Sequence, residues 1–436
     1  MNVLRIGKPL LAGAVIFLMV SCMSSGPPPY NSADKGEKAS RMDDAPIVLV
    51  HGFLGFDAEH IVKFPYWGGA TDLEKELRAY GYPVHTAAVG PVSSNWDRAC
   101  ELYAFIRGGR VDYGAAHSAE YGHARFGREY PGILPEWGSS GSANGGVHKV
   151  HLIGHSMGGQ TARLLVELLE YGDPAERETS REDISDLFAG GHSWVKSVTS
   201  ISTPHDGTSL VYDYADMGFL KKLFARMVAV LSLKQKEPAL DLMIEHWEAA
   251  KSEDESLESF VRRAIREELW KNTRDFCYFD LSPEGAALLN ARAAASPHVY
   301  YFSWGTSRTA ASGAEGHHVP MSGMNLPLHH AARFMGSLED LPRDCGPASE
   351  WWENDGVVNI CSMDGPSLSS KDRIVRRDMV NEEPQPGVWN YMGTLKPLDH
   401  WQVHIASTLD EHTPPGFTSL SDFYMQWCGY LQKLPE

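Results

Sequence analysis

The chain has 436 residues, of which 43% are apolar and 22% are charged, so it is long enough for one large α/β domain or two smaller ones. Its formal net charge of -17 argues against nucleic-acid binding and against adsorption to anionic membranes through overall charge. The composition therefore favours a globular body with a sizeable core and an acidic surface.

The first residues, 1–21, are predicted to be a lipoprotein signal peptide. A basic start precedes an apolar run at 10–20 that is too short for a comfortable membrane span. Residues 18–22, LMVSC, resemble a bacterial lipobox, which implies export, lipid attachment to Cys22 and anchoring to a membrane of the bacterial cell envelope. An ordinary secretory signal followed by a chance cysteine is the alternative. Residues 22–44 are expected to form a flexible tether.

Five cysteines follow Cys22, so at least one of them is free or pairs between chains. No C-x-x-C pair is present, and neither a zinc ribbon nor a thioredoxin-like site is indicated. A disulfide between Cys345 and Cys361 is compatible with an oxidising compartment, although sequence alone does not establish it.

Short apolar runs alternate with helical segments through residues 45–436, the predicted catalytic domain. A helix is expected at 73–80, and a second helix follows residue 160. Buried strands are expected at 46–50, 84–89, 149–153, 195–202 and 299–304. This alternation predicts an α/β fold with a mostly parallel central sheet flanked by helices.

The segment Gly154-His155-Ser156-Met157-Gly158 lies between a predicted strand and a predicted helix. This is the pattern of a nucleophile elbow, in which flanking glycines let strand and helix pass close to a sharp turn. The helix N-terminus behind the serine favours developing negative charge. A structural glycine-rich turn is the less favoured reading, and Ser156 is the candidate nucleophile.

A second motif, His51-Gly52-Phe53, directly follows the first predicted strand. An acyl-transfer site of this architecture takes one backbone N–H from the residue after the nucleophile and another from a loop after an early strand. Met157 and Phe53 are therefore the expected oxyanion donors. A core turn with a chance histidine is the alternative, which the pairing with the elbow disfavours.

A nucleophilic serine needs a base, and the base needs an acid to fix its tautomer. In this architecture the acid and then the histidine follow the serine in the chain. Two polar loops after apolar segments stand out, at 353–359 and 398–401, but spacing alone does not choose among the histidines. The candidates are His205, His317, His318, His329, His330, His400 and His404.

Several further motifs resemble the large secreted lipases of thermophilic bacilli and staphylococci. The resemblance runs from about residue 44 to about residue 406 and implies the α/β-hydrolase fold. It also implies that Ser156 is the nucleophile, Asp355 the triad acid and His400 the general base. The motifs are SSNWDRAC at 93–100, VDYGAAH at 111–117, GHARFG at 122–127, STPHDGT at 202–208, ENDG at 353–356 and the pair Asp399-His400.

The same resemblance implies a structural zinc ion that braces an inserted subdomain, at about 91–130 and 235–275. His117 and His123 are six residues apart, so on one helix they would face opposite sides. They can share an ion only on an irregular segment, which Gly122 permits. Two ordinary solvated histidines are the alternative.

Imidazole and carboxylate ligands in a tetrahedral set suit zinc. The resemblance adds Asp97 to His117 and His123, and it places a fourth ligand at Glu245, where the family usually has aspartate. Because glutamate is one methylene longer, its backbone would retreat slightly, or His246 would replace it.

No calcium site is predicted. The family places a carboxylate two residues after the triad histidine, and this chain has Gln402 there. An amide oxygen can bind a hard cation but lacks the charge. Asp410 is a candidate remnant ligand.

A lid is predicted at about 207–233. The segment 217–231 is apolar around most of its circumference, with a few basic residues. An amphipathic lid would cover the serine in water and open at a lipid surface. A buried helix packed on the sheet is the alternative.

The sequence thus predicts a lipase that hydrolyses long-chain esters such as triacylglycerols through an acyl-enzyme on Ser156. An esterase, phospholipase or polyester hydrolase of the same fold is the alternative, because the elbow and triad do not encode the acyl or head group. A non-catalytic, lipid-anchored binding protein is the alternative from another class. Lipid esters and a membrane are the expected partners, nucleic acid is not, and no oligomeric state is predicted.

Overall fold

The computed structural model describes residues 45–55, 65–69, 71–142, 146–180, 183–213, 243, 246–247, 273–377, 379, 382–406 and 413–435. Among these residues, none of the helices combines the length and the apolar character that crossing a membrane requires. The predicted signal peptide and tether lie outside the described residues.

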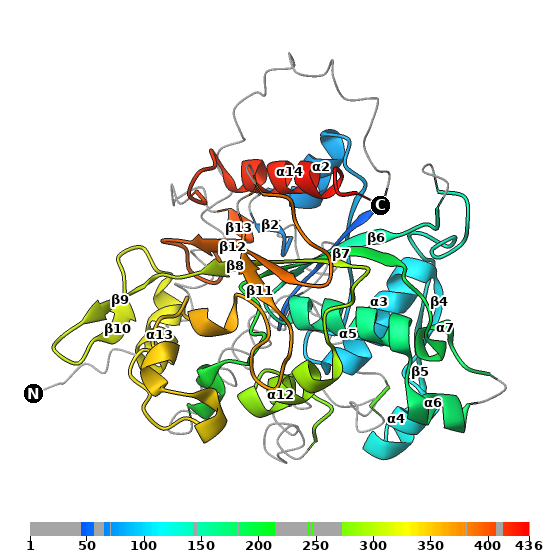
Figure 1. Cartoon of the computed structure of the whole chain (residues 1–436), viewed down its shortest axis with the longest axis horizontal. Coiled ribbons are helices and arrows are strands. Elements are labelled where there is room, and N and C mark those ends of the chain that lie inside the picture. Colours follow the sequence, from blue (N-terminus) through cyan, green and yellow to red (C-terminus); the bar gives the residue numbers. More distant parts are fainter. Residues whose placement is uncertain are drawn as a thin grey trace, which may run out of the picture.

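A seven-stranded sheet forms the centre of the molecule, with strand order β11-β12-β8-β7-β6-β1-β3 (Figure 1). Every neighbouring pair in it is parallel. The expected strands and the mostly parallel sheet are therefore confirmed, with two further strands, β12 and β11, at one edge. The strands are β1 Ile47–Val50, β3 Val84–Thr86, β6 Val150–His155, β7 Val195–Ile201, β8 Tyr300–Thr306, β11 Ile374–Arg376 and β12 Trp389–Leu395.

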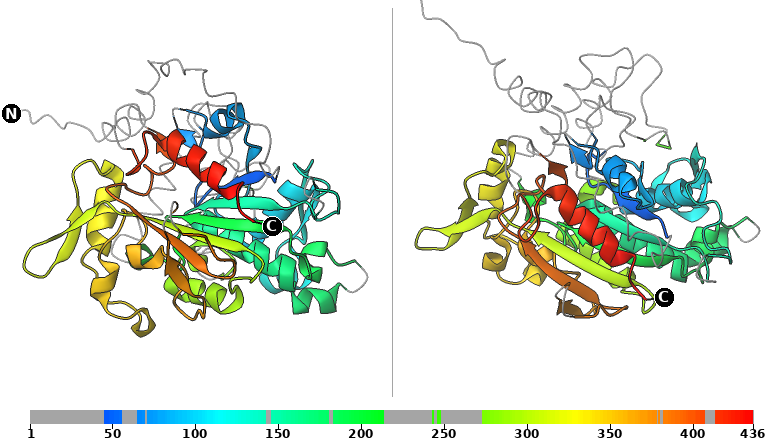
Figure 2. Two further views of the ribbon diagram at one scale, coloured as in Figure 1. Left: turned by 45° about the horizontal axis from the view of Figure 1, so that its top comes forward. Right: turned by 90° about the horizontal axis from the view of Figure 1, so that it is seen from above.

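Helices cover both faces of this sheet (Figure 1, Figure 2). One face packs on α3 (Asn95–Arg107) and α5 (Met157–Tyr171), and the other on α2 (Leu73–Ala79) and α14 (Leu420–Leu431). Strand β1 shows the reason, because Val48 and Val50 enter the first core and Ile47 and Leu49 enter the second. A strand buried on both faces reads as a continuous apolar run, as this one does.

Shorter elements surround this framework. Small two-stranded sheets pair β2 with β13, β4 with β5 and β9 with β10. Their bounds are β2 Gly68–Gly69, β4 Gly109–Asp112, β5 Phe126–Tyr130, β9 Thr309–Ser312, β10 His317–Pro320 and β13 Ile405–Ala406. The remaining helices are α4 Ala115–Tyr121, α6 Pro174–Thr179, α7 Asp186–Ala189, α11 Cys277–Asp280, α12 Pro283–Arg292 and α13 His329–Met335, with short 3-10 helices at Ser209–Tyr212, Leu326–Leu328, Arg343–Cys345, Ala348–Trp351 and Ile360–Ser362.

The predicted insert is described over 91–130, where α3, β4, α4 and β5 follow one another. Of its second half, 235–275, only Met243, His246, Trp247 and residues 273–275 are described. The predicted lid, 207–233, is described only as far as residue 213, so the amphipathic segment predicted at 217–231 lies outside the described residues.

The Cys345–Cys361 disulfide, which the sequence left open, is not formed in the structure. Both cysteines are free thiols, as are the other three described cysteines. Burial raises the pKa of Cys345 to about 11, so this thiol is not an activated nucleophile.

Candidate active site and metal centre

Ser156 lies at the turn between β6 and α5, at the carboxyl edge of the sheet. Its φ of 55° and ψ of -130° form a sharp, strained turn. The flanking glycines are required by space: a Cβ on Gly154 would lie 2.4 Å from the carbonyl carbon of Gly158, and one on Gly158 would lie 2.2 Å from the carbonyl oxygen of Val50. The local geometry is thus that of the predicted nucleophile elbow.

His400 and Asp355 come from separate loops and form a buried pair at the same edge. The Nδ1 of His400 donates to Oδ2 of Asp355 at 2.8 Å, and the His400 backbone amide donates to the Asp355 carbonyl at 3.0 Å. Asp355 is fully buried and His400 is 4% exposed. The pair lies beside the elbow, because the rings of His155 and His400 are 4.6 Å apart between centroids.

Three further donors hold the Asp355 carboxylate. The amides of Val357 and Val358 donate to Oδ1 at 3.0 and 2.8 Å, and the hydroxyl of Thr306 donates to Oδ2 at 2.7 Å. The carboxylate is therefore fixed in orientation, and a carboxylate on Nδ1 leaves Nε2 of His400 as the basic nitrogen. Of the seven candidate histidines, His400 is the one whose Nδ1 bonds a fully buried aspartate among the described contacts.

The loop His51-Gly52-Phe53 lies directly against the elbow. A Cβ on Gly52 would lie only 2.7 Å from Cβ of Ser156. The guanidinium of Arg98 donates to the carbonyl oxygens of His51 and Gly90, which holds the start of this loop. Phe53, the predicted oxyanion donor, is the next residue along this loop.

Gln402 uses both ends of its amide in this region. Its Oε1 accepts from Arg308 Nη1 at 2.7 Å and from the Asp399 amide at 2.9 Å, and its Nε2 donates to the carbonyl of Gly323 at 3.0 Å. The side chain thus joins the histidine loop to its neighbours by hydrogen bonds. Asp410 lies outside the described residues.

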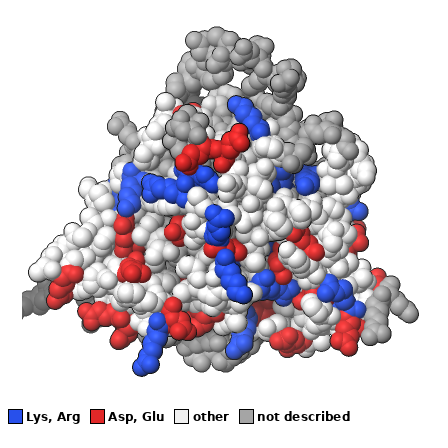
Figure 3. Space-filling view, in the orientation of Figure 1, with Lys and Arg blue, Asp and Glu red and all other residues white. Residues whose placement is uncertain are grey.

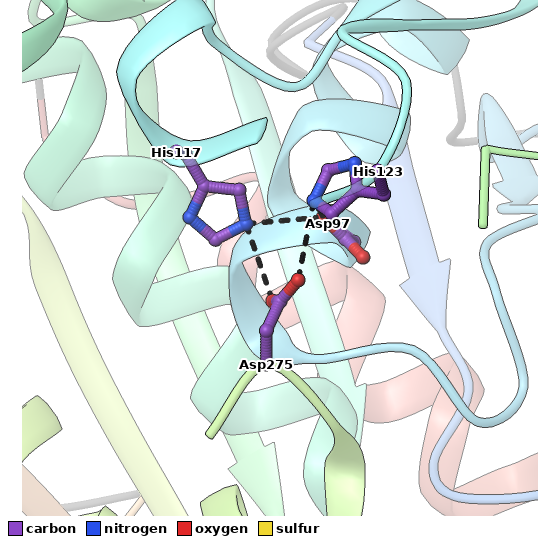
Figure 4. Close-up of side chains that lie close together, drawn as sticks. All are labelled: Asp97, His117, His123 and Asp275. Atoms are coloured by element: carbon purple, nitrogen blue, oxygen red, sulfur yellow. Dashed lines mark ion pairs between the residues drawn. The ribbon is translucent and has the colours of Figure 1, made fainter. Parts of the chain in front are cut away.

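A second polar cluster lies in the insert, where Asp97, His117, His123 and Asp275 point toward one another (Figure 4). Each offers one ligand atom, and these atoms all lie within 4.8 Å of one another. Asp275 Oδ1 is 3.2 Å from Nε2 of His117, and its Oδ2 is 3.2 Å from Nε2 of His123. All four residues are buried in this cluster.

The hydrogen bonds of this cluster fit a cation. Nδ1 of His123 contacts the Ala124 carbonyl at 3.0 Å and must donate to it, so Nε2 presents a lone pair to the centre. Oδ1 of Asp97, both oxygens of Asp275 and Nε2 of His117 and His123 are buried with no hydrogen-bond partner. Burial opposes the charge on His117, yet the neighbouring carboxylates of Asp275 and Asp97 raise its pKa to about 9. The two buried carboxylates therefore favour a positive charge at the centre.

Local sequence explains the positions of Asp97, His117 and His123. Asp97 is in the first turn of α3, whose N-cap Ser94 accepts from the Asp97 amide. His117 lies within α4 and His123 just after its left-handed cap Gly122, so only His123 is on an irregular segment. The prediction that both histidines need a non-helical segment was thus half right.

Sequence reasoning missed Asp275, which occupies the fourth position of the described cluster. The predicted ligand Glu245 lies outside the described residues. Its neighbour His246 contacts the cluster differently, because its Nε2 is 2.9 Å from Oδ2 of Asp97 and leaves Oδ1 to face the centre. Asp275 lies two residues before α11 and belongs to none of the motifs identified in the sequence.

Over the face seen in Figure 3, basic and acidic side chains are interspersed on the described surface. The two signs of charge are thus mixed on this face of the described surface.

Comparison with known proteins places this geometry in context. The family described as "Lipase-like, C-terminal domain" matches residues 43–433. The chain is 35% identical to a lipase of Staphylococcus hyicus over 400 residues, which are 90% of this chain and 58% of that protein. It is 34% identical to lipase 2 of Staphylococcus aureus over 375 residues, or 84% of this chain and 51% of that protein. The chain therefore spans a little over half the length of these curated relatives.

Solved structures agree over almost the whole chain. Lipase 1 of Pelosinus fermentans has a TM-score of 0.78 at 42% identity and covers 91% of this chain and 100% of its own. EstA of Clostridium botulinum has a TM-score of 0.80 at 37% identity over 99% of both chains. The Staphylococcus hyicus lipase has a TM-score of 0.75 at 34% identity over 94% of this chain and 98% of its own. The α/β-hydrolase fold and the resemblance to staphylococcal lipases are thus confirmed, and the chain belongs to the bacterial lipase-like family that these proteins represent.

Proposed function

We propose that this protein is a lipase that hydrolyses carboxylic esters of long-chain acyl lipids, triacylglycerols among them. The observation that carries the proposal is the strained elbow at Ser156 beside the buried His400–Asp355 pair. Family membership supports the same chemistry. Because the chain spans only a little over half the length of its curated relatives, the proposed activity is argued from this site and not from the activity of those proteins.

The residues divide the reaction as follows. Nε2 of His400 takes the proton of the Ser156 hydroxyl as its oxygen attacks the acyl carbon. Asp355 accepts the other ring N–H and stabilises the imidazolium that forms. The backbone amides of Phe53 and Met157 donate hydrogen bonds to the oxyanion, and each contributes about 3 kcal/mol of transition-state stabilisation.

Collapse of this intermediate breaks the ester bond. His400 returns the proton to the departing alcohol, which leaves the acyl group on the Ser156 oxygen. Water then attacks the acyl carbon while His400 removes its proton, and the fatty acid departs as the serine regains its proton.

The metal centre has a structural role in this proposal. Asp97, His117, His123 and Asp275 would hold one zinc ion, because two imidazoles and two carboxylates suit that metal. The ion would supply positive charge that ties α3 and α4 to the chain before α11. Anchoring through Cys22 and a lid at 207–233 stay part of the proposal as sequence predictions.

The test is hydrolysis of an emulsified long-chain triacylglycerol and of p-nitrophenyl palmitate, with fluorophosphonate labelling of Ser156. Ser156→Ala should abolish hydrolysis and labelling. Ser197→Ala is the matched control, because its buried hydroxyl contacts Nδ1 of His151 at 2.7 Å and lies in β7. Full hydrolysis by Ser156→Ala would refute the mechanism, and preference for short monomeric esters would favour an esterase instead.

A further inference from the structure

We propose that the hydroxyl of Tyr66 is a positioning group for catalysis, which links the oxyanion loop to the histidine loop through His155. This inference rests on the proposed function and extends it to residues outside the triad. The hydroxyl lies 2.6 Å from Nδ1 of His155 and 3.1 Å from the amide nitrogen of Gly52. On its other side, Nε2 of His155 lies 3.0 Å from the carbonyl oxygen of His400.

The donor and the acceptor of each of these three hydrogen bonds follow from the chemistry of the groups. A carbonyl oxygen only accepts, so Nε2 of His155 must carry a proton and donate it to His400. Burial lowers the pKa of His155 well below its ordinary value, so the ring is neutral and Nδ1 is a bare acceptor. The Tyr66 hydroxyl must therefore donate to Nδ1, and its oxygen accepts from the Gly52 amide.

The series of hydrogen bonds runs past all the proposed reacting groups. Gly52 precedes Phe53, the proposed oxyanion donor, and His155 precedes Ser156. At the far end the acceptor is the backbone of His400, the proposed base. One hydroxyl thus connects the three loops whose relative positions determine the geometry of attack.

The tyrosine is itself held in place. Its ring stacks on His404, with centroids 4.2 Å apart at 17°, and its carbonyl accepts from Nδ1 of His404 at 2.8 Å. The next residues pair with the strand after His404, since Gly68 in β2 lies opposite Ile405 in β13. Tyr66 is 9% exposed, and burial raises its pKa, so the group stays a phenol at neutral pH.

The experiment compares Tyr66→Phe with Tyr301→Phe. Both remove a buried hydroxyl that accepts a backbone amide, because the Ser296 amide donates to Tyr301 at 3.1 Å. Tyr301 lies in β8, and Ser296, whose amide its hydroxyl accepts, belongs to none of the three loops. Both variants should show a lowered Tm, which calibrates the purely structural loss.

On a soluble p-nitrophenyl ester, kcat of Tyr66→Phe should fall about 10- to 100-fold with KM nearly unchanged, because loops misplaced by a fraction of an ångström lose attack geometry. Fluorophosphonate labelling should slow in parallel, and Tyr301→Phe should keep the wild-type kcat. A kcat for Tyr66→Phe within twofold of wild type, an equal loss in both variants, or a loss confined to KM would each overturn the inference.

A second measurement separates this inference from the proposed function. Nitrogen-15 NMR of labelled histidine should show His155 protonated at Nε2, with Nδ1 losing its hydrogen bond in Tyr66→Phe. Protonation at Nδ1 in the wild-type protein would overturn the link whether or not the protein is active. A wild-type chain that resists fluorophosphonate would instead refute the proposed function.

Discussion

Gly52 is the position where one added methyl group tests the oxyanion assignment most directly. A Cβ there would lie 2.7 Å from Cβ of Ser156, 3.0 Å from the carbonyl oxygen of His155 and 3.2 Å from Oγ of Ser156. Ordinary contact begins at 3.4 Å, so the shortfall against the Ser156 Cβ is about 0.7 Å. In Gly52→Ala the loop and the elbow must therefore move apart.

The size of the catalytic loss follows from this displacement. Oxyanion donors act when they lie about 2.7–3.1 Å from the developing charge, so a shift of about 0.7 Å removes the Phe53 amide from that range. Losing one donor costs about 100- to 1,000-fold in kcat, or about 2.7–4 kcal/mol. Overpacking should also lower the free energy of unfolding by about 1–3 kcal/mol.

The assay is kcat and KM on a soluble p-nitrophenyl ester, with circular dichroism to confirm folding. Gly429→Ala is the control, because Gly429 lies on α14 at the other face of the sheet. The added Cβ there would lie 2.9 Å from the Tyr82 hydroxyl. This variant should lose some stability and keep its kcat. If folded Gly52→Ala retained a kcat within threefold of wild type, the placement of the oxyanion loop against Ser156 would be wrong.

Three further substitutions test the triad, the metal centre and a buried acid. Asp355→Asn should lower kcat about 10⁴-fold with little change in KM, because an amide cannot hold His400 in the required tautomer; a loss below tenfold contradicts the triad. Asp275→Asn should purify with less than one equivalent of zinc and with a Tm close to that of chelator-treated wild type, whereas full metal content would remove Asp275 from the site. Burial raises the pKa of Asp280 from 3.8 to about 7, so between these pH values the folded state keeps a proton that the unfolded state releases. The free energy of unfolding therefore falls as pH rises from 3.8 to about 7. Asp280→Asn should lose less Tm between pH 5 and pH 8 than wild type does, and identical slopes would refute this.

Sequence alone predicted the parts of this fold that depend on local patterns. The β1 run is apolar at every position because both faces are buried. Gly154 is needed by contacts with the nearby Gly158 and Gly159, whereas Gly158 is needed by its contact with Val50 on β1. Strand β12, between β11 and β8, was missed because its sequence, WNYMGTL, mixes polar and apolar residues without a clear period. Its register with β8 also shifts between Tyr391 and Gly393.

The sites were predicted only as far as motifs identify them. Nothing local in the sequence distinguishes His400 from six other histidines, and only the family resemblance selected it. Asp275 had no such motif, because its role depends on the chain returning to α3 and α4 from a distant segment. The contacts of Tyr66 and His155 depend in the same way on three loops meeting at one edge of the sheet.

The metal centre and the active site are joined through one helix. Asp97 faces the metal cluster, and the next residue, Arg98, faces the active site from the same first turn of α3. Its guanidinium donates to the His51 carbonyl and, at 2.9 Å, to Oγ1 of Thr161 on the nucleophile helix α5. A cation that fixes Asp97 therefore also fixes the group that holds the oxyanion loop and α5 together. An ion remote from the serine can thus support hydrolysis through the position of Arg98 while taking no part in the bond changes.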